Sequence, residues 1–185
     1  MGRAVLDNKL MSVKIFLEYD PNLAYIKHEP TGQTPFISAV SNGFVLIAKE
    51  IMNTCPDSVY TPSNVGDNAL HFAIFQEKPD LVDYILSTPQ LHRFINQANN
   101  NGDLPLHFAA YKCDPKLLIS LVTQAGQDYT ALNVSNSNAV NIVYGQTALW
   151  KTFKWVSYLI FIFLTHNTYL NLVLILCHSL IPIMM

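Results

Sequence analysis

Apolar residues recur three times along the chain at a spacing that fits one face of a helix. Each time they occupy positions i, i+1, i+4 and i+5, so a helix would bury them as a single stripe. The three stripes are Ile47, Ala48, Ile51 and Met52, then Leu81, Val82, Ile85 and Leu86, then Leu117, Leu118, Leu121 and Val122. They begin 34 and 36 residues apart, so the pattern predicts one amphipathic helix in each of three similar units.

A short motif precedes each stripe and repeats with the same offsets. Its copies are Gly32-Gln33-Thr34-Pro35-Phe36-Ile37-Ser38-Ala39, Gly66-Asp67-Asn68-Ala69-Leu70-His71-Phe72-Ala73 and Gly102-Asp103-Leu104-Pro105-Leu106-His107-Phe108-Ala109. A glycine at the first position is expected where the backbone must take a positive φ. Pro35 and Pro105 stand where a proline in the first turn of a helix loses no hydrogen bond. Each unit is therefore predicted to contain a turn and a short first helix before the amphipathic second helix.

Prolines mark the ends of the predicted second helices. The pairs Asp20-Pro21, Cys55-Pro56 and Thr88-Pro89 each follow an apolar stretch, and a helix continues poorly through such a proline. The segment Leu10 to Tyr19 lies before the first pair, so it is predicted to be the second helix of an opening unit. The chain is therefore expected to be a series of helix pairs.

These units resemble the ankyrin repeat family, whose Thr-Pro-Leu-His-x-Ala signature and period of about 33 residues match the motif and its spacing. The resemblance spans roughly residues 4–124. It implies an all-α solenoid of about three to four helix-turn-helix repeats. The spacer Leu17 to Ile26 further resembles plant membrane-associated ankyrin repeat proteins of the accelerated-cell-death type. Those proteins carry a C-terminal membrane region and are linked to defence signalling.

Three motif positions depart from the family pattern. Ile37 replaces the motif His in the first copy, and Asn68 and Leu104 replace the motif Thr in the next two. The hydroxyl and imidazole pair that connects neighbouring turns in the family is therefore expected to be incomplete. Because a solenoid gains its stability from the contacts between neighbouring units, we expect the array to be only marginally stable.

Both ends of the predicted array are irregular. The chain begins inside a repeat, so Leu6, Met11 and Phe16 would lack an upstream partner, and we expect a missing N-terminal portion. Near the other end, residues 133–141 are rich in Asn and Ser and predict a loop or linker. A degenerate motif at residues 145–150 begins 43 residues after its predecessor. We therefore divide the chain into a repeat array at 1–130, a linker and degenerate repeat at 131–154, and a hydrophobic tail at 155–185.

The tail, Trp155 to Met185, is 31 residues long and has no charged side chain. As a helix rising about 1.5 Å per residue, it is long enough to cross a hydrocarbon layer of about 30 Å. Lys151 and Lys154 precede it, and basic residues there favour keeping that end in the cytosol. The polar cluster Thr165 to Thr168 divides the run, so two other interpretations stay open. In the first, residues 155–164 are the second helix of a degenerate repeat. In the second, the tail is a truncated or aberrant end.

Composition narrows the classes of function. Hydrophobic residues make up 50% of the chain and charged residues 13%, which argues against a disordered chain or a charged coiled coil. The 11 Lys and Arg against 13 Asp and Glu give a net charge of −2, without the positive excess of a nucleic-acid-binding surface. We therefore expect no nucleic-acid partner. Three widely spaced cysteines do not suit a disulfide framework and indicate a reducing compartment.

No recognisable catalytic or metal-binding pattern accompanies the repeats. His71 and His107 hold matching motif positions, where the family places a histidine that hydrogen-bonds within the turn. The sequence has no Cys-x-x-Cys and no closely spaced histidine pair to offer zinc ligands. It also lacks a Gly-rich phosphate loop, a Gly-x-Ser-x-Gly elbow and a kinase signature. We therefore expect no enzyme activity, no cofactor, no metal and no small-molecule substrate.

A solenoid offers an extended concave surface that suits peptide or protein recognition. The candidate contacts are turn and inner-helix residues, namely Tyr25, His28, Glu29, Tyr60, Asn64, Arg93, Asn99 and Asn100. The resemblance implies a non-catalytic protein-interaction scaffold in plant defence or stress signalling. It would be tethered to the plasma membrane or endoplasmic reticulum with its repeats facing the cytosol, or otherwise be cytoplasmic. Two alternatives are a channel-like or transport-related membrane protein with regulatory repeats, and a soluble, truncated ankyrin binding module.

Overall fold

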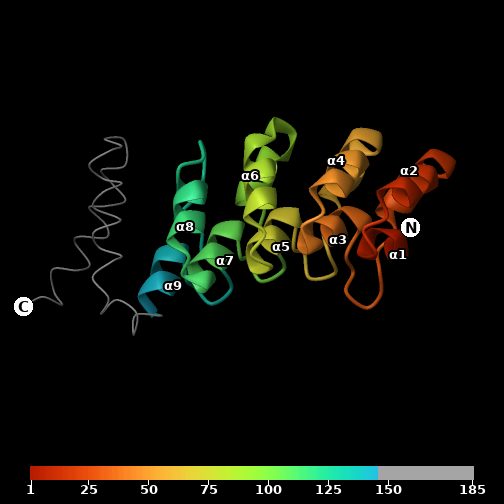
Figure 1. Ribbon diagram of the computed structural model, residues 1–185. Helices are drawn as coiled ribbons and strands as arrows, with labels where there is room; N and C mark the ends of the chain where they lie inside the picture. The colour runs from red at the N-terminus through yellow and green to blue at the C-terminus, as the bar shows by residue number, and fades with distance from the viewer. Residues whose placement is uncertain (146–185) are drawn as a thin grey trace, which may run out of the picture.

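The computed structural model describes residues 1–145, and these form a solenoid of helix pairs in two layers (Figure 1). The inner layer contains α1 (Gly2–Leu6), α3 (Pro35–Asn42), α5 (Ala69–Phe75), α7 (Pro105–Lys112) and α9 (Ala139–Gly145). The outer layer contains α2 (Leu10–Tyr19), α4 (Val45–Thr54), α6 (Pro79–Ser87) and α8 (Pro115–Val122). Turns of 3-10 helix follow three outer helices, as η1 (Pro21–Tyr25), η2 (Pro56–Tyr60) and η3 (Pro89–Asn96). The described residues form no β-strand, and the predicted all-α repeat fold is confirmed over this part of the chain.

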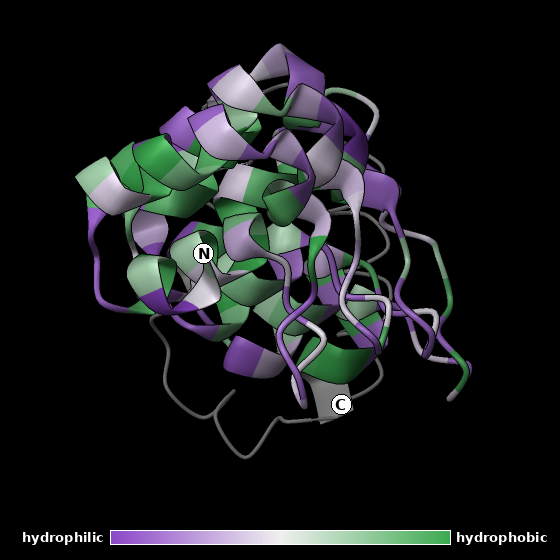
Figure 2. Cartoon of the chain, turned by 90° about the vertical axis from the view of Figure 1, so that its right-hand side faces the viewer, coloured by the Kyte–Doolittle hydropathy of each residue, from purple (hydrophilic) through white to green (hydrophobic). Residues whose placement is uncertain are grey.

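Buried apolar side chains form one cluster that extends from Val5 in α1 to Ile142 in α9, and Figure 2 colours the helices by the hydropathy of their residues. The predicted stripes face this cluster, where Ile51, Ile85 and Leu121 are completely buried. The inner helices pack on one another in chain order, from α1 to α9. Because each unit buries its stripe against its neighbours as well as within itself, the stability of one unit depends on the units beside it.

Glycine and proline shape the turns and the starts of the inner helices as predicted. Gly32, Gly66 and Gly102 have φ angles of 65°, 82° and 73°, in the left-handed region that glycine adopts without a steric penalty. Pro35 and Pro105 are the first residues of α3 and α7, where the missing proline N–H costs no hydrogen bond. The local chemistry of the motif is therefore sufficient to place these turns.

The opening unit contains a helix that the sequence pattern missed. The predicted second helix, Leu10–Tyr19, coincides with α2, and α1 precedes it and packs on α3. Leu6, Met11 and Phe16, for which we expected no upstream partner, are 41%, 69% and 39% exposed. The first helix pair therefore presents an apolar face to solvent in the described structure.

Residues 133–138, within the segment predicted to be a loop or linker, form the turn of a fourth unit, and helix α9 begins at Ala139 inside that segment. The backbone N–H of Asn133 donates to the carbonyl of Ser137 at 3.1 Å, as that of Asn99 donates to Asp103 at 3.0 Å in the preceding turn. Asn136 takes a positive φ of 56° in the fourth turn, and asparagine tolerates that conformation better than most residues. Helix α9 follows, and Gly145, predicted to open the fourth motif, is instead its last residue.

No helix within residues 1–145 is long and apolar enough to cross a bilayer. The predicted tail at Trp155–Met185 lies outside the described residues, as does the degenerate motif after Gly145.

Candidate protein-binding surface

Two buried histidines connect consecutive units through both ring nitrogens. His71 Nδ1 accepts a hydrogen bond from the backbone N–H of Asn68 at 3.2 Å, and Nε2–H donates to the carbonyl of Asp103 at 2.9 Å. His107 repeats the arrangement, accepting from the backbone N–H of Leu104 at 3.0 Å and donating to the carbonyl of Ser137 at 3.1 Å. The predicted local bond is confirmed, and the second nitrogen extends it to the next turn. Each histidine therefore fixes the stacking of two units.

Burial controls the protonation of His71. Burial lowers the pKa of His71 from 6.5 to about 4, although the hydrogen bond to the Asp103 carbonyl and the charge of the Asp103 carboxylate both act to raise it. The side chain is therefore neutral near pH 7, and both of its nitrogens are already hydrogen-bonded. Within residues 1–145, no three His, Cys, Asp or Glu side chains are grouped so that they could hold a metal ion.

The side-chain amide of Asn68 supplies the bonds expected to be missing where it replaces the motif Thr. Its Oδ1 accepts from the backbone N–H groups of Leu70 and His71 at 2.9 and 3.1 Å, which caps α5 as the motif Thr would. Its Nδ2 also donates to the Phe94 carbonyl at 3.1 Å and to Gln97 Oε1 at 3.3 Å, which a Thr hydroxyl is too short to do. Asn68 therefore adds contacts between α5 and the region around η3.

The missing motif side chains at the other two positions are replaced by apolar burial. Leu104 is 4% exposed and supplies no capping oxygen. Ile37 is completely buried, and Thr34 Oγ1 accepts from its backbone N–H at 3.3 Å. The connection between the first two complete motifs therefore lacks the imidazole bond and depends on packing.

Five predicted contact residues lie on the hairpin turns, and three of them take part in hydrogen bonds between neighbouring turns. Asn99 Nδ2 donates to Asp67 Oδ1 at 2.7 Å, and Asn100 Nδ2 donates to the carbonyl of Asn64 at 3.2 Å. Asn64 and Asn100 are nonetheless exposed. His28 and Glu29 are exposed on the first turn, away from these bonds. The structure therefore brings Asn64 and Asn100 together and gives Asn99 a structural partner.

The other three predicted contact residues lie on the 3-10 turns. Tyr25 ends η1 and is 41% exposed. Tyr60 ends η2, where its hydroxyl donates to the Gln90 carbonyl at 2.8 Å. The guanidinium carbon of Arg93 lies 4.2 Å from the centre of the Tyr60 ring, a cation–π geometry. The structure therefore pairs Tyr60 with Arg93, and their role in partner binding stays a prediction.

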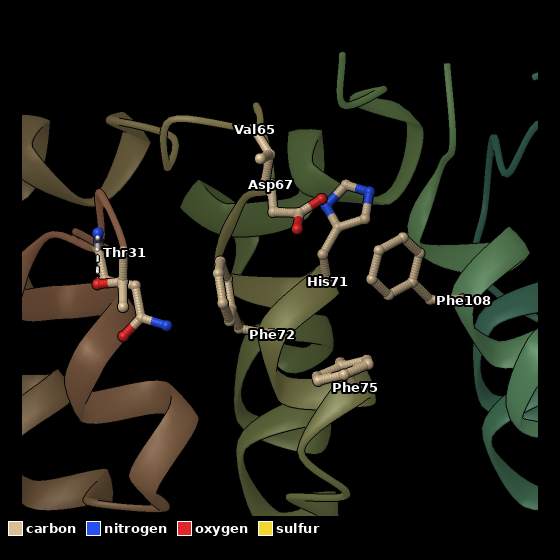
Figure 3. Close-up of a pocket in the computed structure, with 8 residues that line it drawn as sticks. Thr31, Val65, Asp67, His71, Phe72, Phe75 and Phe108 are labelled. Atoms are coloured by element: carbon tan, nitrogen blue, oxygen red, sulfur yellow. Dashed lines mark hydrogen bonds between the residues drawn. The ribbon is translucent and has the colours of Figure 1, made fainter. Parts of the chain in front are cut away.

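A hollow of about 320 Å³ lies between the hairpin turns and the inner helices (Figure 3). We call it the inner-face hollow, and its walls are Thr31, Gln33, Val65, Asp67, His71, Phe72, Phe75 and Phe108. The ring centres of Phe75 and Phe108 lie 6.4 Å apart, and those of His71 and Phe108 lie 4.9 Å apart, both edge to face. Phe75 is 54% exposed and Val65 is 56% exposed. The hollow therefore combines apolar walls with a polar edge from the turns.

The sequence pattern gave no direct sign of this hollow. Phe72, Phe75 and Phe108 lie outside the buried stripes of the second helices, so the periodicity did not select them. Their one signal is a contrast between units, since the first motif has Ser38 and Ser41 where the second has Phe72 and Phe75. An aromatic residue that stands where another repeat of the same chain has serine is a useful sign of an exposed apolar surface.

Two family models for ankyrin repeats match the chain. One describes three copies of the repeat and matches residues 1–93, and the other describes many copies and matches residues 70–122. The chain belongs to the ankyrin repeat family. A comparison with curated proteins gave no match. Ankyrin repeats are generally non-catalytic modules that bind other proteins, which agrees with the extended surface of this array.

Proposed function

We propose that this ankyrin array is a non-catalytic scaffold that binds a protein partner at the inner-face hollow. The observation that carries the proposal is the exposure of Phe75, 54% of whose surface is open to solvent beside Phe72 and Phe108. Aromatic side chains at the centre of an interface supply a large share of binding energy because they bury much apolar surface. A polar edge around apolar anchors is the usual composition of a protein interface.

The polar edge of the hollow comes from two adjacent hairpin turns. Thr31 and Gln33 belong to the first turn, and Asp67 follows the glycine of the second. The second turn is joined to the third by the bond from Asn99 to Asp67, so it is held in place before a partner arrives. A surface that is already ordered loses less conformational entropy on binding. This favours recognition of a partner by a largely preformed site.

The binding proposal is tested by comparing Phe75→Ser with Leu46→Ser in the full-length chain. Leu46 is 68% exposed on the outer helix α4, so it controls for the loss of an exposed apolar side chain. We expect Phe75→Ser to weaken the capture of a partner from extracts of the source cells about thirtyfold, since a central aromatic anchor contributes about 2 kcal/mol. Leu46→Ser should leave capture unchanged. Equal capture by both variants would show that the inner-face hollow does not bind the partner.

We further propose that Trp155–Met185 anchors the scaffold in the plasma membrane or endoplasmic reticulum, with the repeats in the cytosol, where it acts in plant defence or stress signalling. The support is the length of the uncharged run and the lysines that precede it. The full-length chain is expected to stay with membranes after carbonate extraction, and a chain lacking residues 155–185 to be released. Release of both chains would favour a soluble ankyrin module and would end the channel-like alternative as well.

A further inference from the structure

The inner-face hollow contains a carboxylate that has no ionic partner within residues 1–145. Asp67 lines the hollow, and its Oδ1 accepts a hydrogen bond from Asn99 Nδ2 at 2.7 Å. The ion pairs within residues 1–145 join Arg3 to Asp7, Lys14 to Glu50 and Lys112 to Glu77. Asp67 belongs to none of these pairs, so in the described part of the chain its carboxylate is supported by a neutral amide and by no cation.

A second carboxylate makes this region more negative. Burial raises the pKa of Asp67, the hydrogen bond from Asn99 lowers it, and the nearby charge of Asp103 raises it again. Asp103 is 8% exposed, and its Oδ1 is held by the side-chain amide of Asn133 at 2.7 Å. Two partly or fully buried carboxylates supported only by amides would be stabilised by a cation.

The aromatic walls of the hollow also favour a positive charge. The face of a phenyl ring attracts a cation within about 6 Å of its centre. The ammonium of Lys112 already lies 5.1 Å from the centre of the Phe75 ring, while the same nitrogen pairs with Glu77 at 2.9 Å. Phe75 therefore has a cation beside it in this structure. In the view of Figure 3, Phe72 and Phe75 lie below the Asp67 carboxylate and Phe108 lies to its right.

We propose that the inner-face hollow takes one lysine or arginine side chain from the bound protein, with its cationic group beside Asp67 and its methylene chain against Phe72, Phe75 and Phe108. This inference rests on the proposed function, and it names the chemistry of the partner. A volume of about 320 Å³ is at the small end of ligand pockets, which fits one long side chain.

Other side chains fit this site less well. An aliphatic side chain would fill the apolar part, but it would cover the Asp67 carboxylate without pairing it, and an unpaired buried charge is costly. An acidic side chain would meet the Asp67 carboxylate, which has the same sign and lies near the charge of Asp103. Lysine and arginine have both an apolar stem and a charged end, so they match both halves of the hollow.

The proposal is tested with two short peptides that differ only in one charged group. The probes are acetyl-Ala-Ala-Lys-Ala-Ala-amide and the same peptide with norleucine in place of lysine, each added to the full-length chain carrying ¹³C-labelled phenylalanine. The lysine peptide is expected to shift the ring signals of Phe72, Phe75 and Phe108 saturably. It should bind about tenfold more tightly than the norleucine peptide, because a hydrogen bond to a charged group is among the stronger ones.

Asp67→Asn is the matching variant, because it removes the charge and retains a side chain of the same shape. It should abolish the preference for lysine, whereas Asp57→Asn, which removes an exposed carboxylate on η2, should leave the preference intact. Equal binding of the two peptides, or an unchanged preference in Asp67→Asn, overturns the proposal. If Phe75→Ser still weakens partner capture in that case, the inner-face hollow binds a partner of another chemistry. If capture is unaffected too, both proposals fail.

Discussion

Replacing His71 with leucine is expected to lower the free energy of unfolding by about 3 kcal/mol, because the variant leaves buried backbone groups without hydrogen bonds. The backbone N–H of Asn68 loses its acceptor, and the carbonyl of Asp103 loses the bond that joins it to α5. Leucine fills a volume similar to that of histidine, so the cost is one of hydrogen bonding more than of an empty cavity. Urea denaturation of the full-length chain near pH 7.5, followed by circular dichroism, measures the change.

His28→Leu is the control for this measurement. His28 is exposed on the first hairpin turn, so its side chain can be replaced with a change of about 0.5 kcal/mol or less. A His71→Leu variant that is no less stable than His28→Leu would contradict the role of His71 in joining two units.

Acid is expected to destabilise the array through the same residue. The pKa of His71 is about 4 in the folded chain and 6.5 without the effect of burial, so the unfolded chain binds a proton first as the pH falls. The stabilisation from neutral His71 is therefore fully present above pH 6.5 and is lost as the pH falls toward 4. At about 1.4 kcal/mol per pH unit, the loss is on the order of 3 kcal/mol.

Comparing variants isolates this effect from other titrating groups. Asp67 acts in the opposite direction, because burial raises its pKa and so favours the protonated form in the folded chain. Wild type and His28→Leu should lose stability between pH 7 and pH 4.5, and His71→Leu should lose about 2–3 kcal/mol less over that range. Parallel losses in wild type and His71→Leu would show that another group controls the acid response.

Local sequence signals were sufficient for most of the fold. Turn glycines such as Gly66 and first-turn prolines such as Pro105 act through the conformation of one residue, so their effect can be read without knowing what packs on them. The motif of the fourth unit was misplaced at Gly145 because its turn uses Asn136 in place of glycine and its helix lacks the motif proline and histidine. There the contact of α9 with α7 compensates for a weak local signal.

The surface was harder to predict because it is formed by residues from several units. Asn99 looked like a free turn residue, and its bond to Asp67 exists only because two turns 32 positions apart lie side by side. The hollow likewise needs α5, α7 and two hairpin turns in their stacked positions. A pattern within one unit contains no information about such a site. The one available signal comes from comparing units, where aromatic residues replace serine.

The central claim is that this ankyrin array binds its partner at the inner-face hollow, and site-specific photo-crosslinking tests it most directly. The photoreactive residue p-benzoylphenylalanine would replace Phe75 in one full-length chain and the exposed Leu46 on outer helix α4 in another. Irradiation with the captured partner is expected to give a covalent adduct from position 75 and none from position 46. An adduct from position 46 alone, or equal adducts from both positions, would contradict the claim.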